Sequence, residues 1–207
     1  MTSSVNTVIN TLKFKLILTT IKMKQAGSIF IAVVFISCLS CQNTKNDSNA
    51  IAEEKNEKKF DTRAEEKEAD FVAGAIEEKY AEIKLAELAS TKSSNKHVQD
   101  VAQQLVNDQT TSLTAFQNIA NKKGISVPVE EGEEAKEKVN ELAKEQDPDF
   151  DKKWCDEFVA NHEKQIRQYE GMRDRADDTE LKEIITNDLI VLRAQLDKLN
   201  ALEDQIM

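Results

Sequence analysis

Apolar residues recur every three or four positions along most of the chain, the spacing that places them on one face of an α-helix. The pattern predicts two long helices early in this region, over residues 64–89 and 96–122. Ser90–Asn95 interrupts the pattern between them. Gly124 is suited to end the second helix, because glycine readily adopts the left-handed conformation of a helix C-cap.

Three further helices are expected towards the C-terminus, beginning with a short one over residues 133–144. Asp147-Pro148 opens the next, since proline is well placed in a first helical turn, and Asp177–Glu180 resembles a capping box that starts the last. Four long amphipathic helices and one short connector predict an all-α fold, an up-down four-helix bundle over residues 63–207.

A different pattern precedes the predicted bundle. The basic cluster Lys22-Met23-Lys24 is followed by the apolar run Ser28–Ile36, which has the length of a signal-peptide core and is short for a permanent membrane span. The sequence therefore predicts a signal segment over residues 1–40, with Met23 as an alternative translation start.

Two cysteines lie directly after this apolar run. A small residue before a cysteine at such a place resembles the lipobox of bacterial lipoproteins, in which the cysteine receives diacylglycerol and becomes the new N-terminus. Cys41 follows Leu39-Ser40 and is the favoured attachment site, because a polar stretch begins immediately after it. Cys38, after Ile36-Ser37, is the alternative.

The stretch over residues 41–62 consists mainly of Asn, Lys, Glu, Asp and Ser, so we expect the lipidated cysteine to be followed by a disordered polar tether. Gln42 stands where an aspartate would favour retention in the inner membrane. The expected location is therefore the cell envelope, at the outer membrane and facing the periplasm. The expected partners are the membrane, through the lipid, and another envelope protein.

Charge and cysteine content narrow the function further. The chain has 38 acidic and 28 basic residues, a formal net charge of −10, which would repel a phosphate backbone and argues against nucleic acid as a partner. If Cys41 is lipidated and Cys38 leaves with the signal segment, only Cys155 remains, so no intramolecular disulfide is expected. We interpret Cys155 as a small buried residue without a catalytic role.

Several polar residues stand where the apolar stripe of a long helix should continue. They are Glu78, Glu82, Asp108, Gln109, His162, Asp188 and Gln195. One interpretation is a metal site, but the Glu-x-x-His pairs of di-iron bundles are missing, and His162 is the one histidine expected to face inward. We favour a buried hydrogen-bonded network that fixes the register of the helices, with no metal or other cofactor expected.

The order and spacing of several segments resemble those of one protein family. The segments are Phe71-Val72-Ala73, Ala81-Glu82-Ile83, Leu88-Ala89, Val98–Asp108, Phe150-Asp151, Asn161-His162-Glu163 and Leu181–Leu196. The family is called domain of unknown function 4142, and its members are described as envelope or outer-membrane proteins. The resemblance covers residues 63–205 and implies a ferritin-like architecture.

At the polar positions this sequence departs from the family pattern. The family pattern carries Asp-His on the second helix, Asp-His-Glu on the third and a histidine late in the fourth. This chain has Asp108-Gln109, Asn161-His162-Glu163 and Gln195 there, so two of three histidines are replaced by glutamine. The replacement implies weakened metal binding and argues against an enzyme.

The sequence therefore predicts a non-catalytic lipoprotein that binds a partner or supports stress tolerance. One alternative is a metal-binding ferritin-like protein with a degenerate carboxylate and histidine site in the bundle core. Another is a chaperone-like binder of unfolded chains, which an exposed apolar groove would favour.

Overall fold

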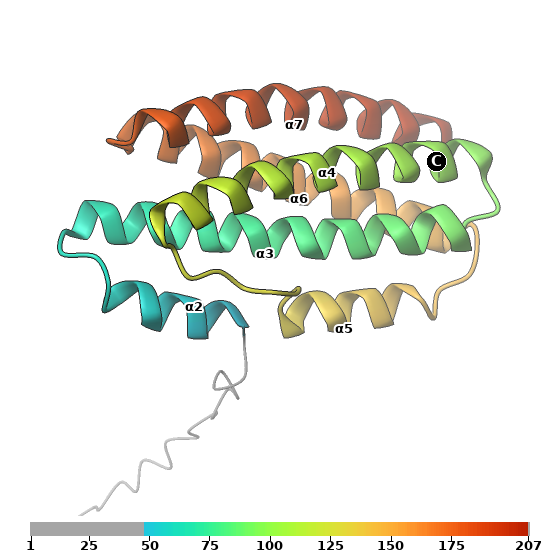
Figure 1. Ribbon diagram of the computed structural model, residues 1–207. Helices are drawn as coiled ribbons and strands as arrows, with labels where there is room; N and C mark the ends of the chain where they lie inside the picture. Colours follow the sequence, from blue (N-terminus) through green and yellow to red (C-terminus); the bar gives the residue numbers. More distant parts are fainter. Residues whose placement is uncertain (1–47, 207) are drawn as a thin grey trace, which may run out of the picture. The chain divides into compact units, whose positions relative to one another are not determined.

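The computed structural model describes residues 48–206, and this part of the chain contains α-helices and no β-strand (Figure 1). The helices are α2 (Ser48–Glu57), α3 (Arg63–Lys92), α4 (Lys96–Lys123), α5 (Glu133–Leu142), α6 (Asp149–Arg175) and α7 (Thr179–Ile206). The predicted all-α helical bundle is confirmed. The predicted signal segment and both candidate lipidation cysteines lie outside the described residues.

Local signals in the sequence set the ends of the long helices. Thr62 caps α3 through a capping box with Glu65, in which each side chain bonds the other residue's backbone N–H. The side chain of Asn95 accepts from the backbone N–H of His97 and begins α4, and Gly124, with φ of 68°, ends it. Asp178 accepts from the backbone N–H of Leu181 at 2.7 Å and caps α7.

The four long helices pack in a ring in which each contacts two neighbours. Helix α3 packs on α4 and α6, and α7 packs on the same two helices. The C-terminal half of α4 shares an apolar cluster with the C-terminal half of α6, so these consecutive long helices run in the same direction across the ring (Figure 1). The short helix α5 carries the chain back between them, and all neighbouring long helices are therefore antiparallel.

Helix α2 is a difference from the sequence prediction. Residues 48–57 were expected to belong to a disordered tether, whereas they form a helix that packs against α3. The fully buried side chain of Asn56 bonds the backbone of Ser126 twice, donating to its carbonyl at 2.9 Å and accepting from its N–H at 2.7 Å. These bonds and the buried Ala52 anchor a segment whose own sequence offers little to bury.

The core consists of two apolar clusters at opposite ends of the ring. One is built around Phe116 and Tyr169, and the other around Trp154 and Phe158. The described residues 48–206 belong to one compact unit that contains both clusters, so the bundle has the core of an independent folding unit. No helix among residues 48–206 is long and apolar enough to cross a membrane.

Candidate functional site

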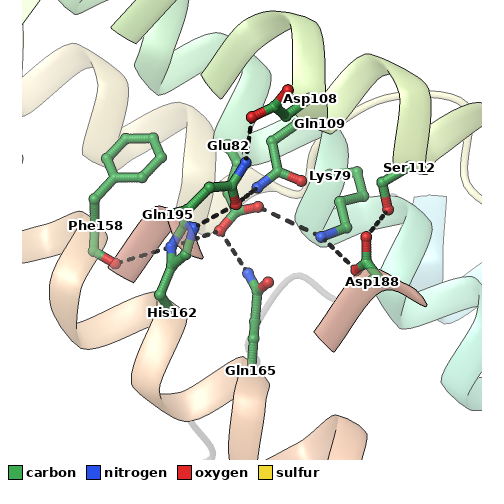
Figure 2. Close-up of polar contacts among 10 residues, drawn as sticks. All are labelled: Lys79, Glu82, Asp108, Gln109, Ser112, Phe158, His162, Gln165, Asp188 and Gln195. Atoms are coloured by element: carbon green, nitrogen blue, oxygen red, sulfur yellow. Dashed lines mark hydrogen bonds and ion pairs between the residues drawn. The ribbon is translucent and has the colours of Figure 1, made fainter. Parts of the chain in front are cut away.

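A layer of buried polar side chains separates the two apolar clusters, and all four long helices contribute to it (Figure 2). Its members are Lys79 and Glu82 of α3, Asp108, Gln109 and Ser112 of α4, His162 and Gln165 of α6, and Asp188 and Gln195 of α7. Hydrogen bonds and ion pairs join these side chains across the ring. We refer to these nine residues as the polar layer.

Lys79 is the most buried charge of the polar layer, with an exposed fraction of 0%. Its ammonium Nζ lies 3.0 Å from Asp188 Oδ2 and 3.9 Å from Glu82 Oε2. Burial alone would lower the pKa of Lys79, but the carboxylates of Asp188 and Glu82 outweigh it, and the pKa is raised. The ammonium also lies 5.5 Å from the centre of the Tyr169 ring, a cation–π contact.

Asp188 is held from two sides. Ser112 Oγ donates to Oδ1 at 2.5 Å, and the ammonium of Lys79 lies against Oδ2. The polar layer therefore pairs this carboxylate with a hydroxyl of α4 and a cation of α3, which links three helices through a single side chain.

Both ring nitrogens of His162 face acceptor oxygens. Nδ1 lies 3.0 Å from the carbonyl of Phe158, and Nε2 lies 3.0 Å from Gln195 Oε1. The carbonyl of Phe158 can only accept, so Nδ1 is the ring nitrogen that donates to it. Glu82 Oε1 lies 3.5 Å from Nδ1.

The Gln195 amide of α7 bonds side chains of both α4 and α6. Its Oε1 also accepts from Gln109 Nε2 at 3.2 Å, and its Nε2 donates to Asp108 Oδ2 at 3.2 Å. With a carboxylate fixing the nitrogen end, the oxygen end faces His162 and Gln109. Gln195 thus accepts hydrogen bonds through its amide oxygen and donates one to Asp108 through its amide nitrogen.

Glu82 connects the two halves of the polar layer. Its Oε1 accepts from Gln165 Nε2 at 2.6 Å, while Lys79 and His162 flank the carboxylate. The layer therefore holds the ammonium of Lys79 against the two buried carboxylates of Glu82 and Asp188, with the imidazole of His162 beside Glu82. Pairing inside the protein offsets the desolvation penalty of burying such charges.

Glu78 lies beside the polar layer, partly buried at the edge of α3. Burial and the nearby carboxylate of Glu82 raise the pKa of Glu78 from 4.5 to about 7, against the lowering effect of Lys79 and Lys164. It lines two clefts along α3, one bounded by α6 and the other by α5 and α6, and Glu82 lines the second of them as well. Glu78 is thus a group beside the polar layer whose charge changes near neutral pH.

The structure brings together most of the polar residues singled out in the sequence. Gln109, His162, Glu82, Asp188 and Gln195 are buried and lie in one network, with Asp108 bonded at its partly exposed edge. Glu78 is the member of the predicted set that stands outside the hydrogen-bonded network.

Sequence reasoning missed Lys79, Ser112 and Gln165. Lys79 belongs to the charged run Glu77-Glu78-Lys79, and such a run is typical of a solvent-exposed helix face. It nevertheless stands three residues after the buried Ile76. Gln165 is four residues before Tyr169, and Ser112 is four before Phe116. Helical spacing from these core residues is the signal that could have found all three.

The polar layer is not arranged as a metal centre. Among residues 48–206, no group of three or more histidine, cysteine, aspartate or glutamate side chains is positioned to hold a metal ion. The geometry gives the reason: the ammonium of Lys79 lies between the carboxylates of Glu82 and Asp188, where a cation would have to bind.

Cys155 is buried, and His97 is exposed at the start of α4. Burial, with smaller contributions from Glu203 and Asp156, raises the pKa of the Cys155 thiol from 9.0 to about 12. A thiol in that state is a poor nucleophile, because the thiolate is the reactive form. Its Sγ lies 3.4 Å from the carbonyl oxygen of Leu199, a packing position.

Fold and site together define an α-helical bundle in which a polar layer, with buried ion pairs of its own, lies between two apolar clusters. The model of the family described as domain of unknown function (DUF4142) matches residues 53–202, and the chain belongs to this family. The matched region begins within α2 and ends within α7, so it covers the bundle. No curated protein and no solved structure matches the chain significantly.

Proposed function

We propose that this chain is a lipid-anchored protein of the bacterial cell envelope, and that its bundle is a non-catalytic binding module. The anchor would be diacylglycerol on Cys41, with Cys38 as the alternative, and the outer membrane facing the periplasm is the proposed location. The lipobox-like sequence Leu39-Ser40-Cys41 after an apolar run supports the anchor.

The observation that carries the non-catalytic role is the internal pairing of the polar layer. Lys79 and His162 face Glu82 and Asp188, and all four side chains are buried. General acid–base catalysis needs a group within hydrogen-bond reach of a substrate. These four groups instead reach one another, which supports a structural role for the layer and leaves binding to the surface.

Mass spectrometry of the full chain extracted from bacterial membranes tests the anchor. The expected N-terminus is an acylated Cys41, and the Cys41→Ser variant is expected to lose the acyl group and leave the membrane fraction. The matched Cys38→Ser variant is expected to remain acylated and membrane-bound. An unacylated N-terminus at Met1 or Met23 in the membrane-bound protein would refute the proposal.

A further inference from the structure

A cleft with a volume of about 770 Å³ lies between the N-terminal half of α3 and the C-terminal part of α6. This size is in the range of pockets that bind small organic ligands. Apolar side chains form much of its lining, among them Phe71, Tyr169 and Met172. The part of α3 that lines it, from Arg63 to Glu78, is about 22 Å long at the helical rise per residue.

Gly74 opens this cleft from the side of α3. Neither usual reason for a glycine applies there: Gly124 is the glycine with positive φ among those described, and a Cβ at Gly74 would meet no atom within 4 Å. A glycine inside a helix costs roughly 0.5–1 kcal/mol relative to alanine. Within the bundle nothing requires this glycine, and its effect is to widen the cleft along an otherwise long, regular helix.

Three cations surround the outer end of the cleft: Arg63, Lys67 and Arg175. All three are exposed, and none forms an ion pair with a carboxylate of the described residues. They stand out in a chain with a net charge of −10. A cluster of unpaired guanidinium and ammonium groups favours an anionic ligand group, and arginine suits a carboxylate particularly well.

Three carboxyl groups also line the cleft, of which Glu68 is engaged with backbone N–H groups and Glu78 is distant from these cations. Glu68 Oε1 accepts from the backbone N–H of Asp177 at 2.5 Å and of Asp178 at 3.2 Å, so it is engaged at the start of α7. Burial raises the pKa of Asp70, with a further contribution from the nearby Glu53, and burial and Glu82 raise the pKa of Glu78. Glu78 stands at the far end of the cleft along α3, away from Arg63 and Lys67.

We infer that the α3–α6 cleft binds a fatty acid, with its carboxylate at Arg63, Lys67 and Arg175 and its acyl chain along the floor beside Gly74. This inference deepens the proposed binding role of the bundle and names the class of ligand. Burial of methylene groups supplies most of the affinity, and the cations select the sign of the head group.

Isothermal titration calorimetry with dodecanoate, below its micellar concentration, tests the inference. The protein used is the chain from residue 41 to residue 207 carrying Cys41→Ser, which contains the whole described bundle, and its folding is checked by circular dichroism. We expect saturable one-to-one binding, tightening about fourfold for each methylene added to the chain. Dodecyltrimethylammonium, which has the same chain and a positive head group, is expected to bind at least tenfold more weakly.

Two pairs of variants separate the floor of the cleft from its rim. Gly74→Leu is expected to weaken dodecanoate binding more than about tenfold by filling the cleft, while Gly74→Ala, with the same backbone benefit, has a much smaller effect. Arg175→Gln is expected to weaken binding about tenfold. Arg167→Gln, on the same helix and outside the cleft, should leave it unchanged.

Equal binding of the two amphiphiles, or unchanged affinity in the folded Gly74→Leu variant, would overturn the fatty-acid site. Absence of saturable binding by the folded protein would also overturn it. None of these results bears on the acylation of Cys41, which is measured separately on the membrane-extracted chain, so failure of the ligand and failure of the anchor are distinguishable.

Discussion

Single side chains of the polar layer are defined by partners on other helices. Lys79 and Gln165 are buried against carboxylates from α3 and α7, although lysine and glutamine are usually exposed. The sequence signal for Lys79 is its spacing from Ile76, and that signal competes with the acidic residues beside it. The burial of a polar side chain was therefore predictable where it interrupted a strong apolar stripe, as at His162, and not where it stood within a charged run.

Glu78 gives the protein a predictable pH dependence. Its pKa is raised from 4.5 to about 7 by burial and Glu82, so the folded state binds a proton that the unfolded state releases at lower pH. The free energy of unfolding therefore falls as pH rises from about 4.5 to 7. Glu78→Gln removes this fall, and at pH 8 the variant should be more stable than the parent by on the order of 2–3 kcal/mol.

Urea denaturation of both proteins between pH 4.5 and 8 measures this difference. The matched control is Glu87→Gln, which changes an exposed carboxylate on the same helix and is expected to leave the slope of stability against pH nearly unchanged. Parallel stability curves for the parent protein and Glu78→Gln would contradict the assignment.

His162 supports a second prediction at this scale, because its Nδ1 lies 3.0 Å from the carbonyl of Phe158 inside the core. Two-dimensional ¹H–¹⁵N spectra of the imidazole should show a proton on Nδ1 that exchanges slowly with solvent. The exposed His97 serves as the internal reference. A ring proton of His162 that exchanges as fast as that of His97 would contradict this hydrogen bond.

Among the elements, the long helices followed from the sequence and α2 did not. The stripes of α4 and α7 are regular over many turns, so periodicity alone predicts them. Helix α2 is short, and its anchor is the contact of Asn56 with Ser126, which is 70 residues away in the chain. A local sequence pattern cannot predict a contact of that range. Residues 48–57 were therefore predicted to be a tether from their polar composition alone.

Asn56→Ala tests whether α2 belongs to the folded bundle. The change removes two hydrogen bonds and leaves backbone groups of Ser126 without them, so stability should fall by about 1–3 kcal/mol. Limited proteolysis should then cut residues 48–60 earlier than in the parent protein. Asn118→Ala, at an exposed position of α4, is the control and should change neither measurement appreciably; unaltered proteolysis of Asn56→Ala would show that the contact does not hold α2.

In the whole molecule, two apolar clusters give stability and the polar layer between them fixes how the four helices meet. Hydrophobic burial is non-directional, whereas the ion pairs of Lys79 and the hydrogen bonds of Gln195 require one register. The pairing across the ring could not be read from the sequence, since it depends on α5 carrying the chain between two helices that do not adjoin.

A double-mutant cycle tests whether Lys79 is the internal counter-ion of the polar layer. The free energy of unfolding is measured by urea denaturation for the parent protein, Lys79→Met, Asp188→Asn and the double variant. Lys79→Met leaves two buried carboxylates without their cation and should cost about 3–5 kcal/mol, whereas Asp188→Asn leaves Lys79 paired with Glu82 alone and should cost less. The exposed pair Lys84 and Glu87, changed in the same way, is the control and should couple by less than about 1 kcal/mol.

If Lys79 and Asp188 form a buried pair, we expect the double variant to be less destabilised than the sum of its two single variants by about 2 kcal/mol or more. Additive effects of Lys79→Met and Asp188→Asn would contradict it, because the two groups would then be independent and the polar layer would not be held together by this buried pair.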